Sequence, residues 1–302
     1  MMNLEMILLA TLDGLSYASL LFLVALGMTL VFGVMHILNM AHGSVYAFGG
    51  YAAASLGIWA ISAGLPAGWG IAALIIAAIA IGAILGGLME VTLLRRIYDK
   101  EPMLQLLITF AAFMIFEDLQ RMIWGTQPYA LSQVVDALGV ANVGEITYTR
   151  YQLFVLPIFA IVIFLALRHF LKRSSMGRQI VAVAHNREIS MTLGINVKKI
   201  CLVTFVVGSI LGALGGALAL PTTSWVPGIG AEMIVLSFAV VATAGLGQIE
   251  GTLVSAILIG LARAFSVYIF PEVEVLVPYL IMVLVLLVRP QGLFSVAQAR
   301  RV

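Results

Sequence analysis

Residues 168–199 read RHFLKRSSMGRQIVAVAHNREISMTLGINVKK and form a long charged interval in a sequence that is otherwise mostly apolar. Between Gly177 and Gly194 the apolar residues are spaced and there is no proline, and a glycine in the last position is typical of a helix end. The pattern predicts a short amphipathic helix. The interval holds seven of the sixteen Lys and Arg residues, namely Arg168, Lys172, Arg173, Arg178, Arg187, Lys198 and Lys199.

The composition of the chain places this charged interval beside a membrane. Hydrophobic residues make up 62% of the sequence and charged residues 10%, and the mean hydropathy is +1.11. In a soluble domain about a quarter of the residues are charged. A net charge of +2 gives no reason to expect nucleic-acid binding, and the single cysteine, Cys201, excludes an internal disulfide.

Nine apolar segments can be cut from the chain at about 20 residues per crossing. We therefore predict an all-α, polytopic transmembrane helical bundle of about eight or nine spans, forming one permease-like domain over residues 1–302. The last segments are separated by a glycine-rich hinge, Gly245–Gly251, so some are expected to be glycine-broken or re-entrant. The predicted segments are Met6–Met35, Ser44–Ser62, Gly70–Leu94, Met103–Trp124, Tyr151–Leu167, Ile200–Leu220, Ala231–Ala244, Thr252–Phe270 and Val275–Val288.

The distribution of basic residues predicts the orientation. Nine crossings with the N-terminus outside would place residues 95–101, 168–199 and 289–301, with thirteen of the sixteen basic residues, in the cytoplasm. Residues 172–199 would then be a cytoplasmic loop. Residues 125–150 would be an external loop, in which Ser132–Asp136 and Val143–Thr149 favour extended structure and a hairpin. A re-entrant pair would reduce the crossings to eight and change the side of the N-terminus.

Charged residues inside the apolar segments need partners, because a bare charge at mid-membrane is costly. Glu117 and Arg121 are four residues apart and are expected to pair, either for structure or for substrate. Glu90 lies about a turn before Arg95, at a predicted segment end. For Arg263 the acidic residue considered is Glu250.

The sequence contains no constellation that supports catalysis. The four histidines are not at metal-ligand spacing with carboxylates, and no phosphate-binding loop, nucleophile elbow or zinc helix occurs. We expect no catalytic residue, no metal and no cofactor. Any ATP-driven movement must therefore come from a partner.

Residues 27–51 read GMTLVFGVMHILNMAHGSVYAFGGY and place Asn39, His42, Gly43 and Ser44 among apolar residues. One interpretation is a turn between two spans, with glycines that let helices approach closely. The other is a broken helix that lines a translocation path, where irregular backbone is tolerated because it faces a cavity.

This segment resembles the signature of LivH-type permeases of branched-chain amino-acid ABC importers. Further blocks that resemble the same family begin at Leu107, Gly177, Gly245 and Leu287, and together they cover almost the whole chain. The order Glu188-Ile-Ser, three residues, Gly194 is similar to the coupling loop of ABC importer permeases. Departures from the family pattern are Ile189 and Ser190 in place of alanines, Gly50 in place of alanine, and residues 248–250 in the glycine hinge.

The resemblance implies a multi-pass permease subunit in the inner (plasma) membrane. Its expected function is to move leucine, isoleucine and valine into the cytoplasm with a homologous second permease, two cytoplasmic ATPases and an external binding protein. The path residues would be Asn39, His42, Gly43 and Ser44. The residues coupling to the ATPase would be Arg187, Glu188, Ile189, Ser190 and Gly194.

Three alternatives remain at this stage. Related permeases carry urea, short amides or other amino acids. A secondary transporter or channel would also have glycine-broken spans. A membrane enzyme would need a polar cluster that the sequence does not show. For the basic interval itself, a solvated loop that only fixes orientation competes with a helix that inserts into a groove on a soluble partner.

Overall fold

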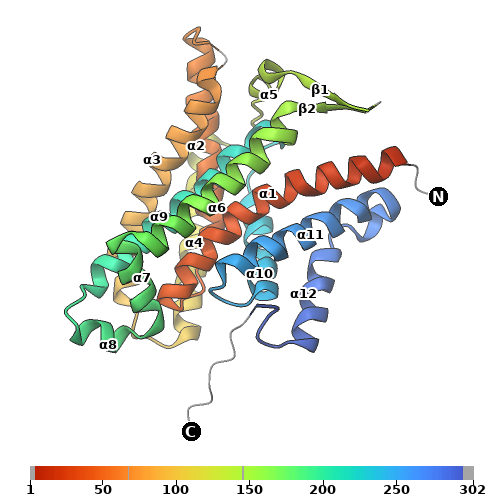
Figure 1. Ribbon diagram of the computed structural model, residues 1–302. Helices are drawn as coiled ribbons and strands as arrows, with labels where there is room; N and C mark the ends of the chain where they lie inside the picture. The colour runs from red at the N-terminus through yellow and green to blue at the C-terminus, as the bar shows by residue number, and fades with distance from the viewer. Residues whose placement is uncertain (1–3, 67, 145, 295–302) are drawn as a thin grey trace.

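The computed structural model describes residues 4–66, 68–144 and 146–294, which form a bundle of helices with one small hairpin (Figure 1). The predicted all-α membrane fold is confirmed. The α-helices are α1 (Leu4–Met35), α2 (His42–Ser62), α3 (Gly68–Thr92), α4 (Pro102–Trp124), α5 (Gln133–Leu138), α6 (Leu156–Arg173), α7 (Ser175–His185), α8 (Arg187–Thr192), α9 (Val197–Ala219), α10 (Ile229–Ala244), α11 (Ile249–Ile269) and α12 (Val277–Val288), and the strands are β1 (Val140–Val143) and β2 (Ile146–Thr149).

Seven helical segments in the described part of the chain are long and apolar enough to cross a membrane. The remaining two apolar segments, α10 and α12, have 16 and 12 residues. At 1.5 Å per residue α12 extends only about 18 Å, less than the roughly 30 Å of a hydrocarbon core. The nine predicted segments therefore all form helices, and two of them, α10 and α12, are short.

Helices α1, α2 and α9 form the centre of the bundle and are the most deeply buried of the long segments. Helix α9 packs against α1, α2 and α3, whereas α4 and α6 lie at the periphery. Helix α11 lies alongside α1, as Figure 1 shows, and the hydroxyls of Thr29 and Thr252 share a buried hydrogen bond of 2.8 Å between them. Lipid tails supply no hydrophobic drive for helix association, so the helices must associate through close packing. Small residues at these contacts permit that packing.

The hairpin end of the molecule is defined by β1 and β2, which pair antiparallel with Val143 opposite Ile146. Two tyrosine hydroxyls fasten this end to the bundle. Tyr148 of β2 donates to Asp13 Oδ1 at 2.7 Å, and Tyr268 of α11 donates to Asp13 Oδ2 at 2.6 Å. Burial, and then the hydrogen bond to Asp13, raise the pKa of Tyr148, so its hydroxyl remains a donor at physiological pH. We call Asp13, Tyr148 and Tyr268 the tyrosine clasp.

The hairpin was predicted from two extended pieces, and one of them is wrong. Residues 132–136 do not form a strand; Gln133–Leu138 is the short helix α5. Val134 of this helix is buried and packs on Gly70 at the start of α3. Apolar residues at positions 131, 134 and 138 have the spacing of a helix face, and burial of that face overrides the strand preference of the two valines.

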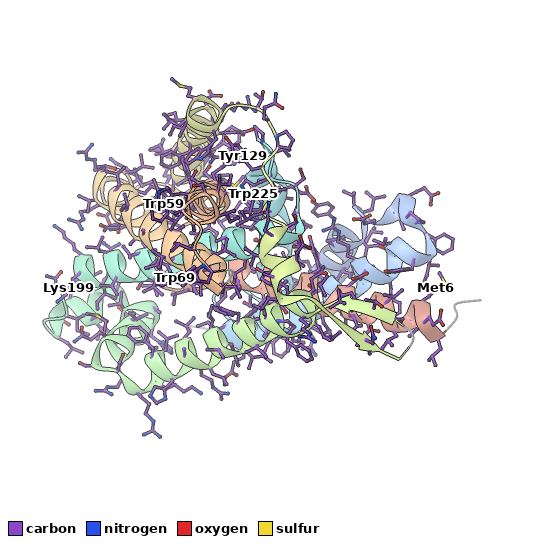
Figure 2. The ribbon with its side chains drawn as sticks, turned by 90° about the horizontal axis from the view of Figure 1, so that it is seen from above. Met6, Trp59, Trp69, Tyr129, Lys199 and Trp225 are labelled. Carbon is purple, nitrogen blue, oxygen red and sulfur yellow. The ribbon has the colours of Figure 1, made fainter. Side chains whose placement is uncertain are left out.

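The opposite end collects the basic segments, and we call it the basic end. Arg187 of α8 lies 3.7 Å from Asp99 in the loop after α3, and Arg168 of α6 lies 3.3 Å from Glu250 at the start of α11. The backbone N–H of Leu293, which follows α12, donates to the carbonyl of Thr243 at the end of α10. Lys199 at this end and Met6 of α1 lie at opposite sides of the molecule in Figure 2.

Candidate translocation and coupling sites

The chain between α1 and α2 is not helical, and several of its polar groups form hydrogen bonds close by. Asn39 Oδ1 accepts a hydrogen bond from the Ala41 N–H at 3.1 Å, and the Asn39 carbonyl accepts one from the His42 N–H at 3.2 Å. The Met40 N–H donates to Thr109 Oγ1 of α4 at 3.3 Å. Irregular backbone inside a membrane protein is tolerated where it is enclosed in this way. Both sequence interpretations expected an interruption of the helix here.

Helices α2 and α10 begin at the same place, against each other. A Cβ atom added to Gly43 would overlap the carbonyl oxygen of Gly230 and lie 2.9 Å from Ile234 Cβ, and one added to Gly230 would overlap the Gly43 carbonyl. Gly228, with φ of +95°, precedes α10. Each helix start carries about half a positive charge from its aligned peptide dipoles. We call this contact of Gly43 with Gly230 the helix-start seam.

Two of the four predicted path residues, Asn39 and Ser44, carry polar groups close to Gly43 in the chain. The Asn39 side chain is 3% exposed, and its Nδ2 has no hydrogen-bond partner among the described residues. Ser44 Oγ donates to the Phe113 carbonyl at 3.3 Å, and the Ser44 carbonyl accepts from Gln120 Nε2 at 3.3 Å. Ser44, Gln120 and Gly230 line a narrow crevice where α2, α4 and α10 meet. In this structure the crevice is too narrow to hold a water molecule, and the polar groups of Ser44 and Gln120 already form hydrogen bonds within the protein.

The third path residue, His42, is packed between helices. Its ring is 1% exposed, and Nε2 lies 3.1 Å from the carbonyl oxygen of Val24 in α1. A Cβ added to Gly212 of α9 would lie 2.8 Å from the ring, and one added to Gly27 of α1 would lie 3.1 Å from it. His42 therefore joins α1, α2 and α9 by filling a notch that two glycines provide.

Trp225 packs against α2 at Ala47 and Gly50, and it was not identified from the sequence. It is fully buried, its Nε1 donates to the Ala47 carbonyl at 3.1 Å, and its backbone pairs with Tyr129, which lies beside it in Figure 2. A Cβ at Gly50 would overlap the indole. The glycine at position 50, where the family pattern has alanine, therefore leaves room for the Trp225 indole.

The expected ion pairs are partly confirmed. Arg121 donates to Glu117 at 2.7 Å, and Arg95 donates to the buried Glu90 at 2.8 Å. The hydroxyl of Tyr98 also donates to Glu90 at 2.6 Å, and burial followed by this hydrogen bond raises the pKa of Tyr98.

The proposed contact between Arg263 and Glu250 is wrong. The two residues are thirteen positions apart on α11, a rise of about 20 Å at 1.5 Å per residue. Arg263 donates instead to Glu274 at 2.7 Å, and it lies 3.9 Å from Glu232. Glu250 lies 3.3 Å from Arg168 and 3.9 Å from Lys172 at the basic end.

The predicted amphipathic helix is divided in two at Asn186. The backbone of Asn186 is extended, and its Oδ1 accepts from the Ile189 N–H at 3.0 Å, so it ends α7 and caps α8. Gly194 has a φ of +81° and ends α8 as predicted. Its N–H donates to the Met191 carbonyl and the next N–H donates to the Ser190 carbonyl, which is the Schellman arrangement.

The predicted coupling residues divide into anchors and exposed groups. Ser190 is 2% exposed and donates to the Asn186 carbonyl at 2.8 Å. Arg187 lies over the Tyr98 ring, 5.2 Å from its centroid. Glu188 and Ile189 are exposed, and so are Met191 and Leu193, two apolar side chains that the sequence analysis did not include. Helix α8 therefore presents an apolar tip at the basic end, a surface suited to a groove on a partner.

Comparison with known proteins gives consistent matches along the chain. A family model described as "Branched-chain amino acid transport system / permease component" matches residues 10–286. The high-affinity branched-chain amino acid transport system permease protein LivH of Escherichia coli is 27% identical over 96% of this chain and 96% of its own length. The corresponding protein BraD of Pseudomonas aeruginosa is 25% identical, again with 96% of each chain covered.

The fold also occurs among solved structures. PsaBC from Streptococcus pneumoniae in complex with Fab superposes with a TM-score of 0.50 and 13% sequence identity, covering 92% of this chain and 91% of that one. At this identity the likeness concerns the fold alone.

Proposed function

The chain belongs to the family of branched-chain amino acid transport system permease components, and from this premise we propose that it carries leucine, isoleucine and valine across the membrane into the cytoplasm. It is a multi-pass membrane protein and the permease subunit of an ABC transporter. Members of this family are transport subunits and are not catalytic, because ATP hydrolysis belongs to separate subunits of ABC systems. The observation that carries the proposal is the family match from α1 to α12, together with named relatives aligned almost end to end.

The proposed assembly contains this chain as a single permease domain, a homologous second permease, two cytoplasmic ATPases and an external substrate-binding protein in the plasma membrane. Residues 172–199 are the proposed cytoplasmic coupling loop, and residues 125–150 the proposed external loop. The arrangement of charge supports this orientation: residues 95–101 and 168–199 and the end of α12 gather at the basic end, away from the hairpin. Basic segments favour the cytoplasmic side.

Coupling is proposed to pass through α8. Glu188, Ile189 and the exposed Met191 and Leu193 would enter a groove on the ATPase, while the buried Ser190 and the positive φ of Gly194 stabilise the shape of the helix. Closure of the ATPase dimer would push α8, and through α7 the spans that α7 contacts, α6, α1 and α9. Rigid movement of packed helices of this kind alternates access to a central site.

Substrate is proposed to pass the helix-start seam. The unpartnered amide of Asn39 and the crevice at Ser44 supply polar groups there, and Gly43 permits close approach of α2 to α10. His42 contributes indirectly, because it holds α2 in place against α1 and α9.

Reconstitution tests the proposal. The chain is placed in proteoliposomes with its permease partner, ATPases and binding protein, and uptake of labelled leucine, isoleucine and valine is measured with and without ATP. We expect ATP-dependent uptake of all three. Uptake of urea or short amides in their place would contradict the substrate, and uptake that persists without the ATPases would contradict the ABC mechanism.

A further inference from the structure

A partly open cavity of about 310 Å³ lies between α1, α2, α10 and α11, on the hairpin side of the helix-start seam. Its volume is at the lower end of the roughly 300–1,000 Å³ typical of small-molecule sites. Helix α10 begins at its wall, with Ile229 among the lining residues. Most of the wall is apolar and would suit an aliphatic side chain, with Leu20, Tyr46, Ala219, Met233, Ala264 and Val267 contributing.

The polar part of the cavity is a cluster around Arg263. Both hydrogen bonds from Arg263 to Glu274, from Nε at 3.2 Å and Nη2 at 2.7 Å, go to the single oxygen Oε1. A guanidinium has five N–H donors, so two such bonds leave it able to bind a further carboxylate. The guanidinium also lies 4.4 Å from the centroid of the Tyr17 ring, which fixes its position.

Arg263 already forms an ion pair with Glu274, so the second acidic residue beside it, Glu232, is not needed to neutralise its charge. Glu232 lies 3.9 Å from Nη2, and its side chain is 62% exposed, whereas Glu274 is 31% exposed and already hydrogen-bonded. Arg263, Glu232 and Glu274 together carry a net charge of −1, and Asp13, which lines the same cavity, adds a second negative charge. This negative charge attracts an ammonium group, and Glu232 is the carboxylate best placed to accept one.

Asp13, the other acidic residue near Arg263, already accepts hydrogen bonds from two tyrosines. Asp13 lines the same cavity, but both of its oxygens accept hydrogen bonds from the tyrosine clasp. The buried hydroxyl of Tyr17 has no hydrogen-bond partner at proper geometry among the described residues. The site thus combines at one end the Arg263 cation, the exposed Glu232 carboxylate 3.9 Å from it and the Tyr17 hydroxyl, and it has an apolar wall.

We infer that this cavity binds the substrate as a zwitterion, with the α-carboxylate on Arg263, the α-ammonium on Glu232 and the side chain against Met233 and Val267. The inference rests on the proposed function, which supplies an amino acid as the substrate. It adds a binding site before the seam and a reason for selectivity: urea has neither charge, and an amine or an acid alone satisfies only one of the two groups.

Protection from cysteine labelling tests the site directly. The complete transporter is placed in nanodiscs with Val267→Cys in a Cys201→Ser background, and its reaction with a soluble maleimide is followed with and without free leucine. Val267 lines the cavity and is 39% exposed, so the new thiol should react. We expect leucine, isoleucine and valine to slow labelling severalfold, and urea, isopentylamine and 4-methylpentanoate to slow it much less.

Matched variants identify the groups responsible. Glu232→Gln and Arg263→Gln should each raise the half-protecting leucine concentration about tenfold or more, as expected for a lost charge-assisted contact. Arg121→Gln, which alters an arginine outside this cavity, should leave protection unchanged, as should Glu272→Gln. Val275→Cys, outside the cavity and 63% exposed, should label at one rate with or without leucine. If Arg263→Gln fails to fold, Glu232→Gln still decides the question.

The outcomes separate this inference from the proposed function. ATP-driven leucine uptake without protection at Val267→Cys would overturn the cavity site and leave the function standing. Protection by urea as strong as that by leucine would overturn the zwitterion assignment. Absence of both leucine uptake and leucine protection would remove the proposed function, and the inference with it.

Discussion

Individual glycines determine how closely the central helices approach one another. At the helix-start seam Gly43 and Gly230 each leave room only for the other's carbonyl, and at α9 Gly212 leaves room for the His42 ring. Packed interiors respond to the addition of even one methyl group. The proposed path is therefore most sensitive to substitution at these single glycine positions.

Gly43→Ala should destabilise the protein. The new Cβ would overlap the Gly230 carbonyl, which is backbone and cannot rotate away, so we expect a loss of about 1–3 kcal/mol and a lower Tm. Thermal unfolding of the purified protein measures it. The control is Gly87→Ala in α3, where an added Cβ meets nothing within 4 Å and should be neutral or stabilise by about 0.5–1 kcal/mol. Equal Tm values for the two variants would contradict the close approach.

Gly50→Ala should be destabilising because of Trp225. The new Cβ would overlap the indole, which is fully buried and hydrogen-bonded to Ala47. Trp225→Phe removes the fused ring and should partly relieve the clash, so the double variant should be more stable than the sum of the single effects by about 0.5–3 kcal/mol. A double-mutant cycle of unfolding measurements gives this coupling. Simple additivity would show that the two residues do not compete for space.

At the scale of elements, α8 combines buried anchors with an exposed apolar tip. Ile189→Ser should leave the fold intact, because the side chain is 57% exposed, while it removes apolar area proposed to bind the ATPase. We expect the affinity for the ATPase to fall tenfold or more, as for an interface anchor, and leucine uptake to fall with it. Binding is measured by titrating purified ATPase onto the permease.

Val181→Ser on α7 is the matched control for this prediction. Val181 is 43% exposed and lies outside α8, so its loss should leave ATPase binding unchanged.

Glu188→Ala and Gly194→Val should uncouple ATP hydrolysis from uptake, the second because a valine cannot hold the φ of +81° without strain. Normal coupled uptake by both variants would refute the role of α8.

The nine apolar segments were predictable from the sequence, but several finer features were not. The split at Asn186 was signalled by an asparagine followed by Glu188, a usual helix start that we took as helix interior. Helix α5 was missed because its valines favour strands in isolation, whereas the helix-face spacing of residues 131, 134 and 138 is buried by contacts such as that of Val134 with Gly70. Local preference cannot show which distant surface will cover a segment.

At the scale of the whole molecule, the orientation can be tested with single cysteines. In the Cys201→Ser background, Glu188→Cys should react with an impermeant maleimide only after the cells are opened, whereas Asn142→Cys in β1 should react on intact cells. Both positions are exposed, so access decides the result. Labelling of Glu188→Cys from outside would place α8 where no ATPase can reach it, and would end the proposal.

The candidate sites show the same limit on prediction from sequence. The segment containing Asn39, His42, Gly43 and Ser44 was found because polar residues stand out in an apolar chain, but its partner at Gly230 lies nearly two hundred residues away. The pairing of Arg263 was mistaken, since Glu274 lies beyond the end of α11 and only the turn at Pro271–Val273 brings it back. Long-range contacts of this kind come from tertiary packing and leave no mark on local spacing.

The tyrosine clasp has a mechanical consequence. Asp13 is held from two sides, by Tyr148 of the hairpin and Tyr268 of α11, and it belongs to α1. If the proposed external binding protein contacts the hairpin, its force would act on α1 and α11 together, and these are the helices that carry Tyr17 and Arg263. In the proposed orientation, one carboxylate would thus link an event at the outer face to both walls of the cavity, while the substrate is still held by the proposed binding protein.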